Sequence, residues 1–276
     1  MAYDGYECLK IRVERGVAFV TIDHPPINLF DAALIPEIRR IGEEIEADDA
    51  VRVVVFDSAN PEFFVAHADV TLILQLPTEL RPKAETLGLF HAMVDRFRTM
   101  PKVTIAKLEG RARGGGSELV LSMDMRFAAI GRAILSQPEV ALGIIPGGSG
   151  TQRLPRLMGR ARALEIIVGC EDIPAELAER YGYINRALPP DELGPFVERL
   201  AYRIASFPAD SLRLAKAAVD AAELPTLEGL LEEAHLFNQT LATQAAQARM
   251  AKFIALGGQT LDTELDLDAI LMKLGE

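Results

Sequence analysis

The stretch "RARGGGSELVLSMD", residues 111–124, constrains the fold of this chain more than any other. Three consecutive glycines precede an apolar run of helical character, and the acid Glu118 stands at its start. Glycine is a poor helix former, and a buried carboxylate is costly without a partner. A strand, a glycine turn and a helix in this order aim backbone N–H groups and the positive end of a helix dipole at one place. That place suits an anion or a developing oxyanion, although an acid that merely caps the helix also explains Glu118.

Two other stretches are candidates for chemistry. In "FFVAHADV" the small residues Ala66 and Ala68 would let a ligand approach the backbone. Between them, His67 is either a catalytic base or a histidine of a surface loop, and no Asp or Ser spacing forms a triad with it. In "LSQPEVALGIIPGGSG" a rigid turn holds Glu139 after Pro138, either near the core or at the rim of a site.

The order of the expected elements predicts the fold class. The segment "ECLKIRVERGVAFVTIDH" predicts a β-hairpin, Asp31 is expected to cap a helix that ends near Ala47, and a helical region is expected over 69–99. Strands alternate with helices in the first two thirds, and helices alone fill the rest, which is typical of an α/β core with an all-helical tail. We therefore expect a core over 1–190 and a helical region over 191–276, whose apolar stripes pack either on another subunit or on the core.

Composition excludes several classes of protein. The 276 residues carry 40 acids against 29 bases, a net charge of −11, which argues against a nucleic-acid-binding surface. The two cysteines, Cys8 and Cys170, lie far apart, the first residues "MAYDGYECLK" predict no signal peptide, and the sequence has no apolar run of membrane length. These features predict a soluble cytoplasmic protein that does not bind a membrane. The four scattered histidines predict no metal site.

Taken in order, "FFVAHAD", "GRARGGGSEL" and "QPEVALGIIPGGSGTQRLPRLMGRARALEII" resemble the signature of the crotonase superfamily, the enoyl-CoA hydratase/isomerase family. The resemblance covers nearly the whole chain. It implies a crotonase-like spiral of ββα units, with a C-terminal helical region that forms a homotrimer or a dimer of trimers. It also implies an acyl-CoA thioester substrate, a place in fatty acid metabolism, and no cofactor, since coenzyme A is part of the substrate.

The resemblance assigns site residues by motif position. It places the oxyanion hole at the backbone N–H groups of Ala66 and Gly115, and the acid/base pair at Glu118 and Glu139. We expect Glu139 to donate the α-proton and Glu118 to activate water. Substrate or coenzyme A contacts are implied at Asn28, Val65, His67, Ala68, Asp69, Gly114, Pro138, Gly147 and Phe253.

The expected reaction is addition of water to a trans-2-enoyl-CoA thioester. Alternatives are double-bond isomerisation or thioester hydrolysis on the same fold, or acyl-CoA binding without catalysis. The chain departs from the family pattern at His67, where glycine is usual, and in "HPPINLF", which lacks a basic residue near the coenzyme A phosphates. The segment 76–99 is expected to shape the acyl tunnel.

Overall fold

The fold contains two β-sheets, and the larger one has helices on both faces. The computed structural model describes residues 3–80, 82–222 and 227–274. The sheet has six strands in the order β1-β2-β3-β5-β7-β10. Its strands are β1 (Leu9–Glu14), β2 (Val17–Ile22), β3 (Val53–Ser58), β5 (Val103–Leu108), β7 (Met125–Ala129) and β10 (Arg186–Leu188). The pair β1 and β2 is antiparallel and confirms the expected hairpin, while the remaining neighbours are parallel.

The smaller sheet shows how the chain repeats. Its order is β4-β6-β8-β9, with β4 (Phe63–Val65), β6 (Arg111–Arg113), β8 (Ile134–Ser136) and β9 (Ile173–Pro174). Three times in succession, a strand of the large sheet is followed by a strand of the small sheet and then by helical structure: β3-β4, β5-β6 and β7-β8. This repetition confirms the predicted spiral of ββα units.

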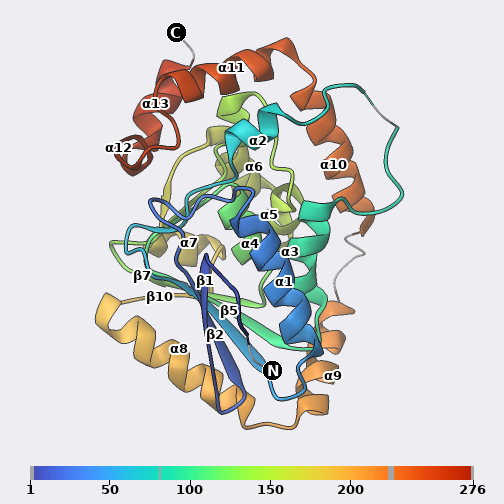
Figure 1. The fold of residues 1–276 in the computed structure, drawn as a ribbon, viewed down its shortest axis with the longest axis vertical. Helices are drawn as coiled ribbons and strands as arrows, with labels where there is room; N and C mark the ends of the chain where they lie inside the picture. Colours follow the sequence, from blue (N-terminus) through green and yellow to red (C-terminus); the bar gives the residue numbers. More distant parts are fainter. Residues whose placement is uncertain (1–2, 81, 223–226, 275–276) are drawn as a thin grey trace.

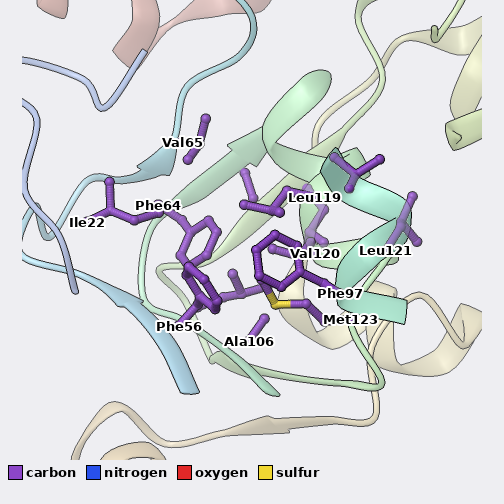
Figure 2. Packing of buried hydrophobic residues seen from close by; sticks show 14 of the residues in the cluster. Ile22, Phe56, Phe64, Val65, Phe97, Ala106, Leu119, Val120, Leu121 and Met123 are labelled. Atoms are coloured by element: carbon purple, nitrogen blue, oxygen red, sulfur yellow. The ribbon is translucent and has the colours of Figure 1, made fainter. Parts of the chain in front are cut away.

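Helices follow the strands of each repeat, and most of them pack on one face of the large sheet. They are α1 (Leu34–Ala47), α2 (Val70–Leu74), α3 (Leu89–Thr99), α4 (Gly115–Leu121), the 3₁₀ helix η1 (Glu139–Leu142), α5 (Gly150–Met158), α6 (Arg160–Gly169) and α7 (Ala175–Tyr181). Figure 2 shows the centre of this core, where Leu119 and Val120 of α4 pack near Phe56 and Phe97. The two phenylalanine rings meet edge to face, 5.1 Å between centroids. The helix that follows the glycine run is therefore fixed by a dense apolar core.

The C-terminal helices divide between opposite ends of the molecule. Helix α8 (Pro190–Ala205) lies across the other face of the large sheet, followed by α9 (Ala209–Asp220) (Figure 1). Helices α10 (Leu227–Leu241), α11 (Gln244–Ala255), α12 (Leu261–Leu265) and α13 (Leu267–Lys273) follow. Of these, α11, α12 and α13 lie at the opposite end of the molecule, close to α2 (Figure 1). The tail thus contacts both the core sheet and the region of the predicted site.

Two local expectations had different outcomes. Helix α1 ends at Ala47 as expected, and the Asp31 carboxylate accepts bonds from the amides of Ala33 and Leu34, 2.9 Å each. The expected continuous helical region over 69–99 is wrong, because α2 ends at Leu74 and α3 begins only at Leu89. The intervening sequence contains Pro77 and Pro82, and proline disfavours helix both at its own position and at the residue before it.

Candidate active site

The glycine run forms a tight turn between β6 and α4. Gly114 has φ of 48° and ψ of −124°, a conformation that disfavours any residue with a side chain. A Cβ at Gly116 would lie 2.5 Å from the carbonyl oxygen of Val65, so the absence of a side chain lets α4 pack directly on β4. Gly115 begins the helix and has Ala68 and Phe90 as its neighbours. The turn therefore brings the helix N-terminus against the loop that follows β4.

Glu118 projects from the first turn of α4 into the protein interior. It is 3% exposed, and its Oε1 accepts hydrogen bonds from the amides of Gly148 (2.7 Å) and Gly150 (2.9 Å). Burial, reinforced by the charge of Glu233, raises the pKa of Glu118 to about 7, while the two amide bonds act in the opposite direction. Because its bonds reach across to another loop, Glu118 does not act as a local helix cap.

Glu139 is the second buried acid, at the start of η1 directly after Pro138. The residue is 9% exposed, and its Oε2 is buried without a hydrogen-bond partner among the described residues. Its Oε1 lies 2.8 Å from where a Cβ on Gly114 would stand, so the acid faces the glycine turn. Burial, and secondly the charge of Glu118, raise the pKa of Glu139 well above its usual range. The two acids therefore differ: one has amide donors, and the other has an unpartnered oxygen.

A cavity of about 440 Å³ joins these groups. Its polar end includes Glu118, Glu139, Gly115 and Gly147. The remaining wall is largely apolar and comes from α1, α2, α3 and α10 and from the segments beside them: Phe30, Ile35, Ala68, Asp69, Leu72, Ile73, Gln75, Leu76, Phe90, Ile144 and Phe237. An apolar cleft with a few convergent polar groups is the usual form of a small-molecule site.

A smaller cavity of about 30 Å³ adjoins the first and holds three further predicted residues: His67, Pro138 and Phe253. It shares Ala68, Gly115 and Glu139 with the larger cavity. The structure thus brings together predicted site residues that stand up to 186 positions apart, as between His67 and Phe253.

Other predicted contacts have structural roles instead. The Asn28 side chain is fully buried and donates to Ser58 Oγ (2.8 Å) and to the carbonyl oxygens of Phe63 and Phe64, so it ties its own loop to β3 and β4. Val65 is fully buried in the hydrophobic core (Figure 2). Asn28 and Val65 therefore line neither cavity, in contrast to their predicted contact with substrate.

The amide of Ala66 is also engaged elsewhere. It donates to the carbonyl oxygen of Ile27 at 3.2 Å, and the residue is fully buried beside Ile27 and Phe63. This bond contradicts the expectation that Ala66 supplies an oxyanion donor. Two residues further on, the amide nitrogen of Ala68 lies 3.5 Å from where a Cβ on Gly115 would stand. Ala68, and not Ala66, therefore has its amide beside the start of α4.

His67 lies in the interior, which excludes the surface-loop interpretation. It is 6% exposed; its Nδ1 is 2.8 Å from the carbonyl oxygen of Ala68, and its Nε2 is 3.0 Å from Oε1 of Glu264. Its ring meets Phe253 edge to face, with 5.9 Å between centroids. Both ring nitrogens are thus engaged by the protein, which leaves His67 poorly suited to act as a base.

Sequence reasoning missed a third buried acid, Glu233 of α10. It is 1% exposed and accepts from the amides of Ser149 (2.6 Å) and Thr151 (2.7 Å), from the Thr151 hydroxyl, and from His91 Nε2 at 3.0 Å. The signal in the sequence is its place in the apolar stripe of α10. Leu230, Glu233, Phe237 and Leu241 follow one another at spacings of three and four.

Two further observations concern the part of the chain that the structure describes. Its His, Cys, Asp and Glu side chains form no group of three that could hold a metal ion. None of its helices combines the length and the apolar character needed to cross a bilayer.

Comparison with known proteins shows the family of the chain. Residues 12–256 match the model of the enoyl-CoA hydratase/isomerase family. Crotonyl-CoA hydratase of Syntrophomonas wolfei is 34% identical over 252 residues, covering 90% of this chain and 95% of that protein. Short-chain-enoyl-CoA hydratase of Clostridium acetobutylicum is 33% identical, with 87% and 92% covered.

Solved structures show the same fold. A Streptomyces avermitilis protein superposes with a TM-score of 0.89 at 39% identity and covers 98% of this chain and 99% of that one. An enoyl-CoA hydratase from Bacillus anthracis gives a TM-score of 0.72 at 27% identity, with 91% and 97% covered. The chain belongs to the enoyl-CoA hydratase/isomerase family and has the crotonase fold. It is an enzyme of this family, with hydratase-type function.

Proposed function

We propose that this protein adds water across the double bond of a trans-2-enoyl-CoA thioester. The observation that carries the proposal is the pair of buried acids, Glu118 and Glu139, which face one cavity in different hydrogen-bonding environments. Two amide donors favour the ionised form of Glu118, and the unpartnered oxygen of Glu139 favours its protonated form. One acid is therefore set to take a proton while the other gives one.

Both acids act in the single step that adds water to the double bond. Glu118 takes a proton from water as the water oxygen bonds to C3. The π electrons move toward the thioester oxygen, and C2 receives the proton of Glu139. Glu118 then carries a proton and Glu139 is ionised, so a proton must return from the first to the second before the next turnover.

Negative charge on the thioester oxygen is stabilised by an oxyanion hole made of the amides of Gly115 and Ala68. This assignment rests on their proximity, on the start of α4 at Gly115, and on the engagement of the Ala66 amide by Ile27. Removing one such donor typically slows a reaction by about 10²–10³-fold. The acyl chain would follow the apolar wall of the larger cavity, which includes Leu72, Phe90 and Phe237.

The direct test uses crotonyl-CoA and longer trans-2-enoyl-CoA thioesters. We expect loss of the absorbance of the conjugated double bond and a product heavier than the substrate by one water. A product of unchanged mass would show isomerisation, and free coenzyme A would show hydrolysis. Either product, or binding without turnover by folded protein, contradicts the proposal.

We further propose that the protein forms a homotrimer or a dimer of trimers. No residue of α9 is buried, and Leu214 and Val219 are 56% and 68% exposed, an apolar surface that a second copy of the chain would cover. Light scattering coupled to gel filtration should give three or six times the chain mass of 30.1 kDa. A mass of one chain at micromolar concentration contradicts this assembly.

A further inference from the structure

The C-terminal segment of the chain contacts the loop that carries Ala68 at three points. His67 Nε2 is 3.0 Å from Glu264 Oε1. The side chain of Gln259 accepts from the amide of Val70 at 2.5 Å and donates to Asp69 Oδ1 at 2.9 Å. The backbone of residues 67–69 is held on another side by Phe30, whose amide donates to His67 and whose carbonyl accepts from Asp69, 2.9 Å each.

The two contacts of the His67 ring require a proton on each nitrogen. Nδ1 faces the carbonyl oxygen of Ala68 and Nε2 faces the carboxylate of Glu264, and both partners are acceptors. Only the imidazolium form donates to both. Glu264 is the matching counter-ion: it is fully buried, and its Oε1 also accepts from the amide of Gln259 at 2.8 Å. The charge of Glu264 raises the pKa of His67 against the effect of burial, and His67 lowers that of Glu264.

The charged groups around this pair are largely balanced. Arg113 donates to the carbonyl oxygen of Glu264 at 2.8 Å and forms two bonds with Asp172, at 2.8 and 2.5 Å. Its guanidinium lies 4.0 Å from Glu264 Oε2 and disfavours the imidazolium. Asp268 of α13 lies near Arg113 and Asp172, and Glu139 borders the same small cavity as His67. Protonation of His67 therefore depends chiefly on Glu264.

We propose that Glu264 and Gln259 are positioning residues that brace the loop at residues 67–70, Glu264 through His67 and Gln259 through Asp69 and Val70, so that the C-terminal segment completes the catalytic geometry. The proposal rests on the proposed function, in which the Ala68 amide binds the thioester oxygen. His67 Nδ1 fixes the carbonyl of Ala68, Glu264 fixes the His67 ring, and Gln259 fixes the next two residues. An oxyanion donor must be held in place before the reaction, and displacement by about 1 Å can cost on the order of 10²-fold in rate.

The test compares Glu264→Gln with Asp262→Asn, a matched control at an exposed position of the same helix. Glutamine keeps the size of Glu264 and removes its charge, so the buried His67 loses its counter-ion and one of its two protons. We expect kcat on crotonyl-CoA to fall by about 10–100-fold with KM changed less than about 3-fold. The control should behave as wild type. Equal kcat in Glu264→Gln and wild type, with both folded, overturns the proposal.

A pH profile distinguishes positioning from general loss of structure. The defect of Glu264→Gln should shrink as pH falls, because His67 regains its second proton, and should grow as pH rises. A defect that is constant from pH 5.5 to 8.5 overturns the role of the imidazolium.

If Glu264→Gln does not fold, Gln259→Ala replaces it, because it removes the contacts to Asp69 and Val70 without leaving a buried charge. Its expected loss is in kcat, and unchanged kcat again overturns the brace.

Two measurements complete the test. The first is the kcat of His67→Gln, Glu264→Gln and the double variant. The double variant should be no slower than the slower single variant, and a loss equal to the product of the two single losses would contradict a shared role.

The second uses a bound cinnamoyl-CoA thioester, whose absorbance shifts to the red when its carbonyl is polarised. This shift should shrink in Glu264→Gln. Wild type that shifts this probe but does not hydrate crotonyl-CoA would refute the proposed function alone, whereas an equal shift in both proteins would refute the brace.

Discussion

Glu118 and Glu233 bind alternate amides of one turn. Glu118 accepts hydrogen bonds from the N–H groups of residues 148 and 150, and Glu233 accepts them from residues 149 and 151. The turn is the start of α5, where N–H groups lack partners within the helix. One helix start thus serves two buried carboxylates from different parts of the chain, and the charge of Glu233 reaches Glu118.

The acid pair leads to the first prediction. Glu118→Gln and Glu139→Gln should each lower kcat by about 10²–10⁴-fold, the usual contribution of general acid–base catalysis. Because both acids act in one step, the double variant should be much less impaired than the product of the two single effects. Steady-state kinetics on crotonyl-CoA provides the check, with the exposed Glu179→Gln as control. Full activity of either single variant contradicts the pair.

Glu233 should set the pH range of activity. Glu118 works as a base only when ionised, so kcat/KM should fall as pH falls through its pKa of about 7. Since the charge of Glu233 raises that pKa, Glu233→Gln should move this limb to lower pH, by about one unit or less. The control is Glu232→Gln, the exposed neighbour on α10, whose carboxylate pairs with Lys83. An acidic limb of the kcat/KM profile that stays at the same pH in Glu233→Gln, or moves to higher pH, would contradict this role of Glu233.

Gly116 should be required for stability. A Cβ there would lie 2.5 Å from the backbone oxygen of Val65, so Gly116→Ala must push α4 away from β4. We expect a loss of about 1–3 kcal/mol in the free energy of unfolding, the usual cost of overpacking. Gly169→Ala is the matched control, because nothing lies within 4 Å of its added Cβ. Denaturant unfolding measures both, and equal stabilities would contradict the close approach.

Phe90 should limit the length of the acyl chain. Its ring lines the larger cavity and packs edge to face on Phe30, 5.8 Å between centroids. Phe90→Ala enlarges the cavity, so the ratio of kcat/KM for an eight-carbon to a four-carbon enoyl-CoA should rise about 10-fold. The surface variant Phe207→Ala should leave the ratio unchanged. An unchanged ratio in Phe90→Ala, with four-carbon activity retained, places the acyl chain elsewhere.

The sequence predicts the parts of the site that local patterns encode. Gly115, Glu118 and Glu139 lie within short motifs, and the structure brings all three to one cavity. The order of strand, turn and helix around Gly115 also follows from the propensities of the flanking residues and from the three consecutive glycines.

Sequence patterns do not predict a site residue where two similar neighbours could fill the same role. They also do not predict one whose partner lies far along the chain. Ala66 and Ala68 are chemically alike, and only the bond from Ala66 to Ile27 shows which amide is engaged elsewhere. Glu233 and Glu264 meet their partners across 142 and 197 positions; helical periodicity can mark Glu233 as buried, but it does not show which distant residue it contacts.

The contacts of Glu233 and Glu264 also bear on when the site can form during synthesis. His67 and Glu118 leave the ribosome early, and they can fold into the core with the first repeats, since domains fold from the N-terminal side during synthesis. The turn at 148–151 and the loop at 67–70 acquire their remaining partners only after residues 233 and 264 have emerged. A nascent chain would thus hold a packed sheet before it holds a working site, because the loop at 67–70 lacks its Glu264 contact until residue 264 has been synthesised.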